Sequence, residues 1–157
     1  MRFRGASEPV GRSVWIVVAS LVLVLCGCSK FQVPLLFGGH SHMEVEVSAD
    51  LNQNSPLALD LLVVYDQKLL ESLEKKTATE WFKNRAQFLK DKKKLKSHHW
   101  EWVPGQPGLK VRFNFKRNAR GGLIFANYQS AGDHRARFNP HRHLRISLEE
   151  KDFTLVQ

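Results

Sequence analysis

The chain has 157 residues and a formal net charge of +9 at pH 7. This length suits one domain with a modest core and excludes a large multidomain enzyme. Both cysteines, Cys26 and Cys28, lie near the start of the chain, which excludes a disulfide framework in the sequence that follows them.

The first segment is basic and then apolar. Arg2, Arg4 and Arg12 precede an apolar run that begins at Val14 and ends within residues 21–29. Positive residues, then roughly a dozen apolar residues and a small residue, are typical of a secretory signal peptide. The run is too short to be interpreted first as a spanning helix, which needs about 20 apolar residues.

The end of this run, Leu-Cys-Gly-Cys at residues 25–28, resembles the lipobox of bacterial lipoproteins. Cys26 departs from the usual pattern, which has Ala, Ser or Thr at that position. The resemblance implies that residues 1–27 are a signal peptide that is removed, and that Cys28 is lipidated and anchors the chain. Ser29 resembles the residue found after the cysteine in lipoproteins sent to the outer membrane. A plain signal peptide and a short signal anchor remain alternatives.

The partner that the basic charge suggests depends on this export signal. Removing residues 1–27 takes away three arginines and one glutamate, so the formal charge falls from +9 to +7. A basic cytoplasmic protein would suggest nucleic acid as a partner. An exported basic domain instead indicates anionic lipid head groups or an acidic protein surface, so no nucleic-acid partner is expected.

Residues 28–42 are expected to form the lipidated tether. Their first half is apolar, with Phe31, Val33 and Phe37, and Gly38-Gly39 then supplies a flexible break. The apolar half either lies on the membrane surface or packs against the domain, and both alternatives stay open.

The next segments predict two neighbouring strands. Residues 43–50 alternate strictly between apolar and polar, which predicts a half-buried strand. Residues 52–56 are turn formers closed by a proline. Residues 57–65 are almost continuously apolar, which is typical of a central strand buried on both faces.

Helical sequence follows in one excursion at about residues 67–90. Asp66 is placed to cap a short helix at 67–74. Thr77 and Glu80 have the spacing of a capping box, which predicts the start of a second helix. Its apolar and aromatic stripe, which begins at Trp81, is expected to cover a sheet.

Short strands fill the rest of the chain. The charged run at 90–96 is expected to be solvated surface. Alternating or apolar segments separated by turn residues predict strands at 98–103, 109–116, 123–128, 135–138, 143–148 and 152–156. The predicted fold class is therefore mainly β: a β-sandwich at residues 43–157 with the helical insertion at about 67–90.

The sequence offers no catalytic constellation. It has no GxSxG, HExxH or phosphate-loop motif, and Cys28 is acylated in the lipoprotein interpretation. His141 and His143 are metal-ligand candidates, with His134 or the pair at 98–99 as a further ligand. No carboxylate or thiolate lies at ligand spacing, so an exposed basic edge is favoured. We expect no enzyme activity, no metal, no cofactor and no small-molecule substrate.

The order of these features resembles the type VI secretion lipoprotein family TssJ, loosely across residues 43–157. The matching features are the lipobox at Cys28, the strand at 45–49 that leads to Asn52, the step at 54–57 into a buried strand that ends at Tyr65-Asp66, the helical excursion with Trp81-Phe82, the turn at 103–105 and the late core strand at 123–125.

The resemblance implies a transthyretin-like β-sandwich anchored at the periplasmic face of the outer membrane. It implies a structural role in the type VI secretion membrane complex, in which the domain docks the periplasmic part of a TssM-like inner-membrane protein. In the family, the loop between the first two strands contacts TssM. The matching residues here are Asn52, Gln53, Asn54 and Ser55, but this loop is short. Part of the contact is therefore expected to lie either on the excursion at 66–96 or on the basic loop with Arg117, Asn118 and Arg120, and both alternatives stay open.

An alternative from another class is a periplasmic pilotin-like lipoprotein, or a carrier of lipid or peptide. It predicts a groove between the helices and the sheet in which Trp81, Phe82 and Trp100 are exposed. A scaffold role predicts that these aromatic side chains are buried.

Overall fold

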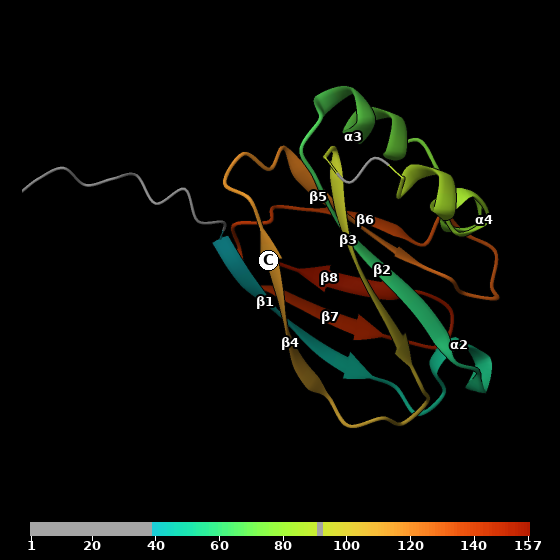
Figure 1. Ribbon diagram of the computed structural model, residues 1–157. Coiled ribbons are helices and arrows are strands. Elements are labelled where there is room, and N and C mark those ends of the chain that lie inside the picture. Colours follow the sequence, from blue (N-terminus) through green and yellow to red (C-terminus); the bar gives the residue numbers. More distant parts are fainter. Residues whose placement is uncertain (1–38, 91–92) are drawn as a thin grey trace, which may run out of the picture. The chain divides into compact units, whose positions relative to one another are not determined.

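A computed structural model describes residues 39–90 and 93–157 of the chain. The predicted signal peptide, Cys28 and most of the predicted tether lie outside these residues. The described elements are, in chain order (Figure 1), β1 (Gly39–Val47), α2 (Leu51–Asn54), β2 (Leu57–Val64), α3 (Gln67–Leu73), α4 (Ala78–Phe88), β3 (Leu95–Trp102), β4 (Leu109–Phe115), β5 (Gly121–Ala126), β6 (Arg135–Phe138), β7 (Leu144–Leu148) and β8 (Phe153–Val156).

The strands form two layers. Within the described residues, one four-stranded sheet has the order β4-β1-β7-β8 and the other has the order β3-β2-β5-β6. Neighbouring strands are antiparallel, except that β1 and β7 run parallel, with Met43 opposite Leu144. The predicted mainly β fold with two sheets and a helical insertion is confirmed.

The space between the sheets is filled by alternate side chains of the strands. Leu59, Leu61 and Val63 of β2 point into it, as do Met43 and Val45 of β1, and none of the five is more than 2% exposed. Burying each such side chain contributes about 1.5–3 kcal/mol relative to leaving it in water. The alternation predicted for β1 is confirmed, with its apolar side facing the core.

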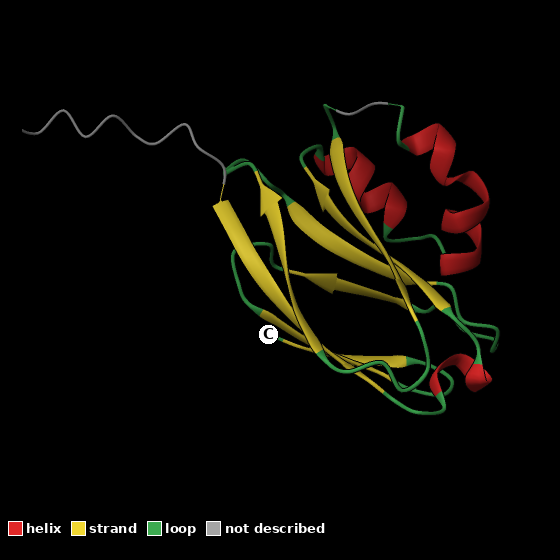
Figure 2. Cartoon of the chain, turned by 60° about the horizontal axis from the view of Figure 1, so that its bottom comes forward, coloured by secondary structure: helices red, strands yellow, loops and turns green. Residues whose placement is uncertain are grey.

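The opposite face of β2 packs under the helices. Leu62 and Val64 contact a second cluster that includes Leu70 of α3 and Trp81 of α4. The Trp81 ring stacks on Phe125 of β5 at a centroid distance of 5.3 Å. Figure 2 shows α3 and α4 on the outer side of this sheet. Because both faces of β2 are covered, the predicted doubly buried strand is confirmed.

Both longer helices begin at the residues that the sequence predicts. The Asp66 carboxylate accepts a 2.8 Å hydrogen bond from the Leu69 backbone N–H. Thr77 and Glu80 form the reciprocal capping box, each side chain accepting from the other residue's N–H. No helix in the described part of the chain is long and apolar enough to cross a membrane.

β1 starts earlier than expected, because residues 39–42 pair with β4 and do not belong to the tether. Ser41 is 2% exposed, and its hydroxyl donates a 2.6 Å hydrogen bond to the Arg142 carbonyl. A Cβ atom at Gly39 would lie 2.6 Å from the Phe115 ring. Gly39 therefore serves a close packing contact and is not the flexible break that we predicted.

β3 also reaches further than predicted. It begins at Leu95, inside the charged run that was expected to be solvated surface. Leu95 is 3% exposed and packs in the cluster under the helices. A single leucine among lysines therefore marked the start of a strand.

Candidate interaction surface

The turn between β1 and β2 has a left-handed backbone. In α2, φ is positive at Asn52 (47°), Gln53 (56°) and Asn54 (61°). Asparagine tolerates this region better than most residues, whereas a residue such as Gln53 costs about 1–2 kcal/mol there. The predicted turn is therefore present, and it holds backbone strain at an exposed position.

Asn52 fixes this turn from within. Its side chain is buried, its amide nitrogen donates to the Pro56 carbonyl at 2.9 Å, and its amide oxygen accepts from the Gln129 N–H at 2.8 Å. The backbone N–H groups of Asn52 and Gln53 donate to the carbonyls of residues 149–150 at 3.2 Å. These bonds hold the left-handed turn against two other loops.

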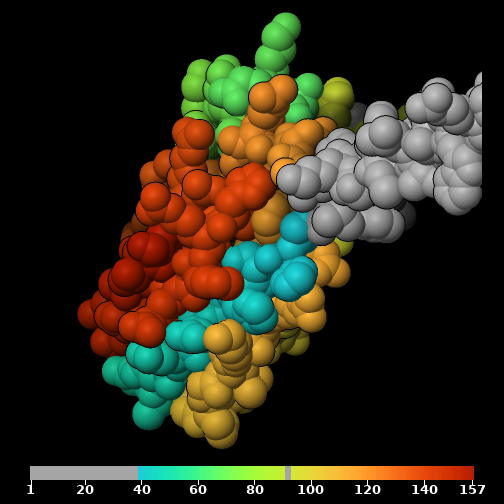
Figure 3. Space-filling view, turned by 90° about the vertical axis from the view of Figure 1, so that its left-hand side faces the viewer, coloured from blue at the N-terminus to red at the C-terminus, as the bar shows by residue number. Residues whose placement is uncertain are grey.

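Four loops meet at this end of the sandwich, which we call the α2 end. They comprise residues 48–56, 103–108, 127–134 and 149–152. The Gly105 N–H donates to the Ser48 carbonyl at 3.0 Å, and the Tyr128 hydroxyl donates to the Asp152 carbonyl at 2.8 Å. Burial raises the pKa of this tyrosine, so it stays a neutral donor. Figure 3 shows the teal residues of the α2 turn beside the gold residues of the β3–β4 loop.

The exposed surface of the α2 end is acidic. Gln53 and Asn54 are exposed at its tip, and Val103, in the loop at 103–108, is 49% exposed. Its exposed carboxylates outnumber its single lysine, Lys151; they belong to Asp50, Asp133, Glu149, Glu150 and Asp152. This surface combines amides, an apolar residue and negative charge on a backbone that its hydrogen bonds hold in place.

Arg117, Asn118 and Arg120 lie at the opposite end, so the structure does not bring them together with residues 52–55. This end, which we call the entry end, comprises the start of β1 at Gly39 and the loops at 116–120 and 139–143. These loops carry exposed Lys116, Arg117, Arg120 and Arg142, and within them the described residues include no carboxylate side chain. A single contact patch made of both predicted groups is excluded by this placement.

A buried carboxylate was missed by the sequence analysis. Asp60 of β2 is 1% exposed and accepts a 2.8 Å hydrogen bond from the Trp81 indole N–H. The Arg85 guanidinium lies 3.6 Å from the same oxygen, and the other oxygen lies 2.5 Å from His99 Nδ1. The group ties α4 to β2 and β3. Asp60 is the one charged residue in an apolar strand. Since a buried charge needs partners, that position could have indicated a buried polar contact.

Asp152, His134 and Ser130 are arranged like a catalytic triad, but their hydrogen bonds link two loops. His134 is 5% exposed, with Nδ1 at 3.1 Å from the Asp152 carboxylate and Nε2 at 3.5 Å from the Ser130 hydroxyl. Nε2 lies closer, at 2.9 Å, to the Ser130 carbonyl, and the hydroxyl donates to the Lys151 carbonyl. The group therefore fastens two loops of the α2 end together.

The remaining histidines do not form the metal set that was considered. His141 and His143 lie in the loop before β7, where His141 packs against Phe115 and His143 against His42. His134 is at the other end of the sandwich. In residues 39–90 and 93–157, no three metal-ligating side chains are grouped.

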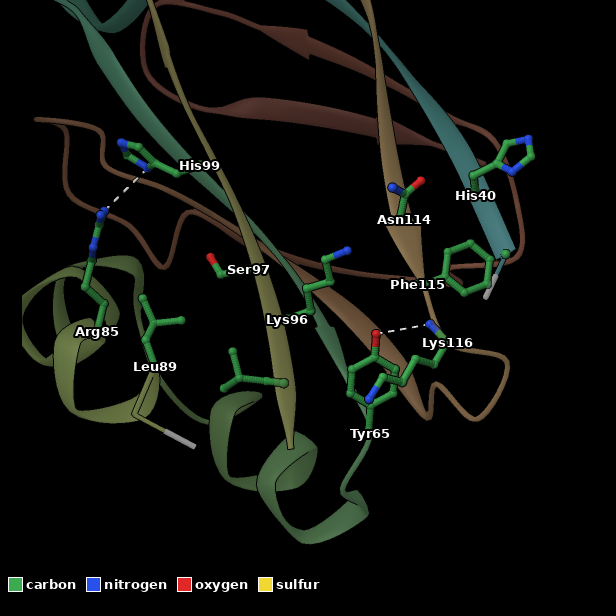
Figure 4. A pocket seen from close by; sticks show the side chains of 12 residues that line it. His40, Tyr65, Arg85, Leu89, Lys96, Ser97, His99, Asn114, Phe115 and Lys116 are labelled. Carbon is green, nitrogen blue, oxygen red and sulfur yellow. Dashed lines mark hydrogen bonds between the residues drawn. The ribbon is translucent and has the colours of Figure 1, made fainter. Parts of the chain in front are cut away.

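A groove runs along the open edge of β3, near the entry end (Figure 4). It has a volume of about 800 Å³ and is lined from α4, β1, β3 and β4. Trp81 is fully buried, and Phe82 and Trp100 are half-buried and do not line the groove. The carrier alternative's expectation that these three aromatic side chains are exposed in a groove is therefore wrong.

Solved structures resemble this fold although sequence comparison finds no relative. No family model matches the sequence, and no curated protein matches it. The type VI secretion lipoprotein TssJ1 from Pseudomonas aeruginosa superposes with a TM-score of 0.60 at 16% identity, over 76% of this chain and 95% of that chain.

Two further structures extend the likeness. Serratia marcescens Lip, a membrane-bound component of the type VI secretion system, gives a TM-score of 0.58 at 16% identity, over 75% of this chain and 97% of that one. A chain in a structure described as the TssM C-terminal domain from EAEC gives 0.54 at 14% identity, over 75% and 98%. The fold implied by the resemblance to TssJ is confirmed.

Proposed function

We propose that this chain is a TssJ-type lipoprotein, anchored at the periplasmic face of the outer membrane, and that its α2 end docks the periplasmic domain of a TssM-like inner-membrane protein. The observation that carries the proposal is the left-handed turn at residues 52–54, held rigid by Asn52. The shared fold supports the class of protein, and the turn supports the place of contact.

A rigid turn suits recognition because its shape is fixed before the partner arrives. Ordering a flexible loop during binding costs about 0.5–1.5 kcal/mol for each immobilised side chain, and a preformed turn avoids much of that cost. Gln53 and Asn54 are exposed on it, so they are free to contact a partner. Strained backbone that the surrounding structure holds in place is common at ligand clamps and other functional sites.

The two ends of the sandwich suit the two attachments that this role needs. Cys28 precedes Gly39 by 11 residues, a reach of at most about 40 Å when fully extended. The tether therefore limits how far the entry end moves from the bilayer. The α2 end lies at the far end of β1, where it is available to a partner that crosses the periplasm.

The docking is tested with Gln53→Arg combined with Glu150→Lys. Both residues are exposed, and Gln53→Arg leaves the backbone requirement of the turn unchanged. We expect affinity for the TssM-like periplasmic domain, measured by calorimetry with the detergent-solubilised full chain, to fall at least about tenfold.

Arg117→Glu with Arg120→Glu is the matched control at the entry end, and it should retain affinity within about threefold. Unchanged affinity of the α2-end variant, or loss confined to the control, would remove the α2 end from the contact.

Lipidation is tested separately with Cys28→Ser. The thiol is the acceptor for the acyl anchor, so the variant should leave the outer-membrane fraction after export, and the wild-type N-terminal peptide should carry acyl chains by mass spectrometry. A wild-type peptide without acyl chains would contradict the anchor while leaving the docking proposal open.

A further inference from the structure

The groove beside β3 combines an apolar floor with a cationic rim. Leu89, Leu95 and Phe115 supply apolar surface, and the aromatic ring of Tyr65 continues it. Its volume of about 800 Å³ lies within the range of about 300–1,000 Å³ that is typical of sites for small ligands. The groove is therefore large enough for one hydrocarbon chain with a polar head.

Two of its cations have no carboxylate partner in the described residues. Lys96 and Lys116 are exposed at the rim, and the Lys116 ammonium lies 5.7 Å from the centre of the Tyr65 ring. In contrast, the charge of Arg85 is balanced by Asp60 behind it, at 3.6 Å. Positive charge in excess is therefore concentrated at Lys96 and Lys116.

Neutral donors and acceptors complete the rim. Ser97 of β3 and Asn114 of β4 also line the groove (Figure 4). No acidic side chain is among the described residues that line it. An anionic head group would meet cations and hydrogen-bond donors there and no like charge.

We propose that this groove binds a single-chain anionic amphiphile, with the acyl chain along Leu89, Leu95 and Phe115 and the carboxylate or phosphate at Lys96 and Lys116. Charge complementarity selects the head group, and the apolar floor selects the chain. The ligand would be a bound lipid and not a substrate. The site is separate from the α2 end, so it stands or falls independently of the docking proposal.

The test uses full-length protein in membranes isolated from expressing cells, with palmitic acid that carries a photoreactive diazirine in its chain. After irradiation, mass spectrometry of the digested protein should find the label on peptides that contain residues 89–97 and 113–116. Unlabelled palmitate should compete and hexadecanol should not. Equal competition by hexadecanol would overturn the role of the lysines, and label spread evenly over the surface would overturn the site.

The head-group contact is tested with Lys96→Glu combined with Lys116→Glu. Both side chains are exposed, so the fold is expected to survive, and labelling should fall at least about tenfold. Arg117→Glu with Arg120→Glu changes the net charge equally at the same end but outside the groove, and it should change labelling less than about twofold. Equal losses in the two variants would mean general attraction to the membrane surface and would overturn the proposal.

A benzophenone amino acid at Asn114 identifies the occupant and its source. Asn114 is exposed in the groove. After irradiation in cells, an adduct with the mass of a fatty acid or of a single-chain lysophospholipid supports the proposal and tells the two sources of the acyl chain apart, whereas an adduct with a two-chain phospholipid would contradict the single chain. A polypeptide adduct, from another protein or from this chain's own tether, would overturn the proposal.

Discussion

The two ends of the sandwich differ in how they are held and in what they carry. At the α2 end, three of the four loops are cross-linked through the buried side chains of Asn52 and His134, the fourth is joined by a backbone hydrogen bond, and the exposed surface is acidic. At the entry end the loops are basic, and an open groove lies beside them. The α2 end is held rigid by its hydrogen bonds, whereas the entry end presents a charged and partly apolar surface.

This difference shows that the net charge of a small basic domain does not describe each of its surfaces. The formal charge of the whole chain is +9, yet the loops of the α2 end are acidic. The loops where the chain enters the domain carry Lys116, Arg117, Arg120 and Arg142, and the strained backbone is at the opposite end. The proposed attachment to a bilayer and to a partner would use both ends.

The largest difference in stability between the two ends is expected when Asn52 is replaced by Ala. The variant removes the hydrogen bonds to the Pro56 carbonyl and from the Gln129 N–H and forces Ala into the left-handed region, so unfolding free energy should fall by about 2–4 kcal/mol. Asn118→Ala at the entry end, where the side chain is exposed, should change it by less than about 0.5 kcal/mol. Urea denaturation measures both, and equal effects would mean that the two ends are held alike.

Charge reversal at the two ends should have different effects on membrane binding. Arg117→Glu with Arg120→Glu should weaken binding of the lipid-free processed form to phosphatidylglycerol vesicles at least about thirtyfold, since each cation near an anionic surface contributes about 1 kcal/mol. Glu149→Lys with Glu150→Lys should not weaken it. Co-sedimentation at low and high salt provides the measurement, and equal weakening by the two pairs would contradict an oriented membrane contact.

A smaller effect is expected at the strained residue of the turn. Gln53→Gly should raise unfolding free energy by about 0.5–1 kcal/mol, because glycine adopts a positive φ without the steric cost but loses more entropy on folding. Gln67→Gly, in the first turn of α3, is the control and should lower it by a similar amount. A Gln53→Gly variant that is less stable than wild type would show that the turn is not strained.

The smallest effect concerns the acid sensitivity of His98 in β3. Burial lowers the pKa of His98 below its ordinary 6.5, so the folded state disfavours the proton that the unfolded chain accepts. Stability should therefore fall as the pH drops through about 6.5 and towards the folded pKa. His98→Phe should flatten this part of the pH profile in thermal unfolding. An unchanged slope would assign the acid sensitivity to other groups.

Much of the fold follows from local pattern. Alternation predicted β1, a continuous apolar run predicted β2, and the capping box at Thr77 marked the start of α4. These predictions are confirmed because the alternation of side chains along a strand and the caps of a helix depend on residues that are close in sequence. The bounds of β1 and β3 were missed, because Gly39 and Leu95 take their roles from Phe115 and from the helices, which are distant in sequence.

The candidate site was predictable only in part. Residues 52–55 could be identified as a turn, but their left-handed backbone depends on hydrogen bonds to loops near residues 129 and 149. The partners of Asp60 are equally remote, since Trp81 and His99 come from other elements. The separation of Arg117 from the α2 turn depends on the strand topology, which cannot be read from the local sequence around either segment.

The position of β1 between β4 and β7 has a consequence for assembly. Met43 pairs with Leu144, so the first strand completes its hydrogen bonding only when nearly the last part of the chain is present. Such distant pairing delays folding until the chain is almost complete. In the proposed lipoprotein, the enzymes that act on Cys28 would therefore meet a chain that has not yet closed, with no folded domain to obstruct them.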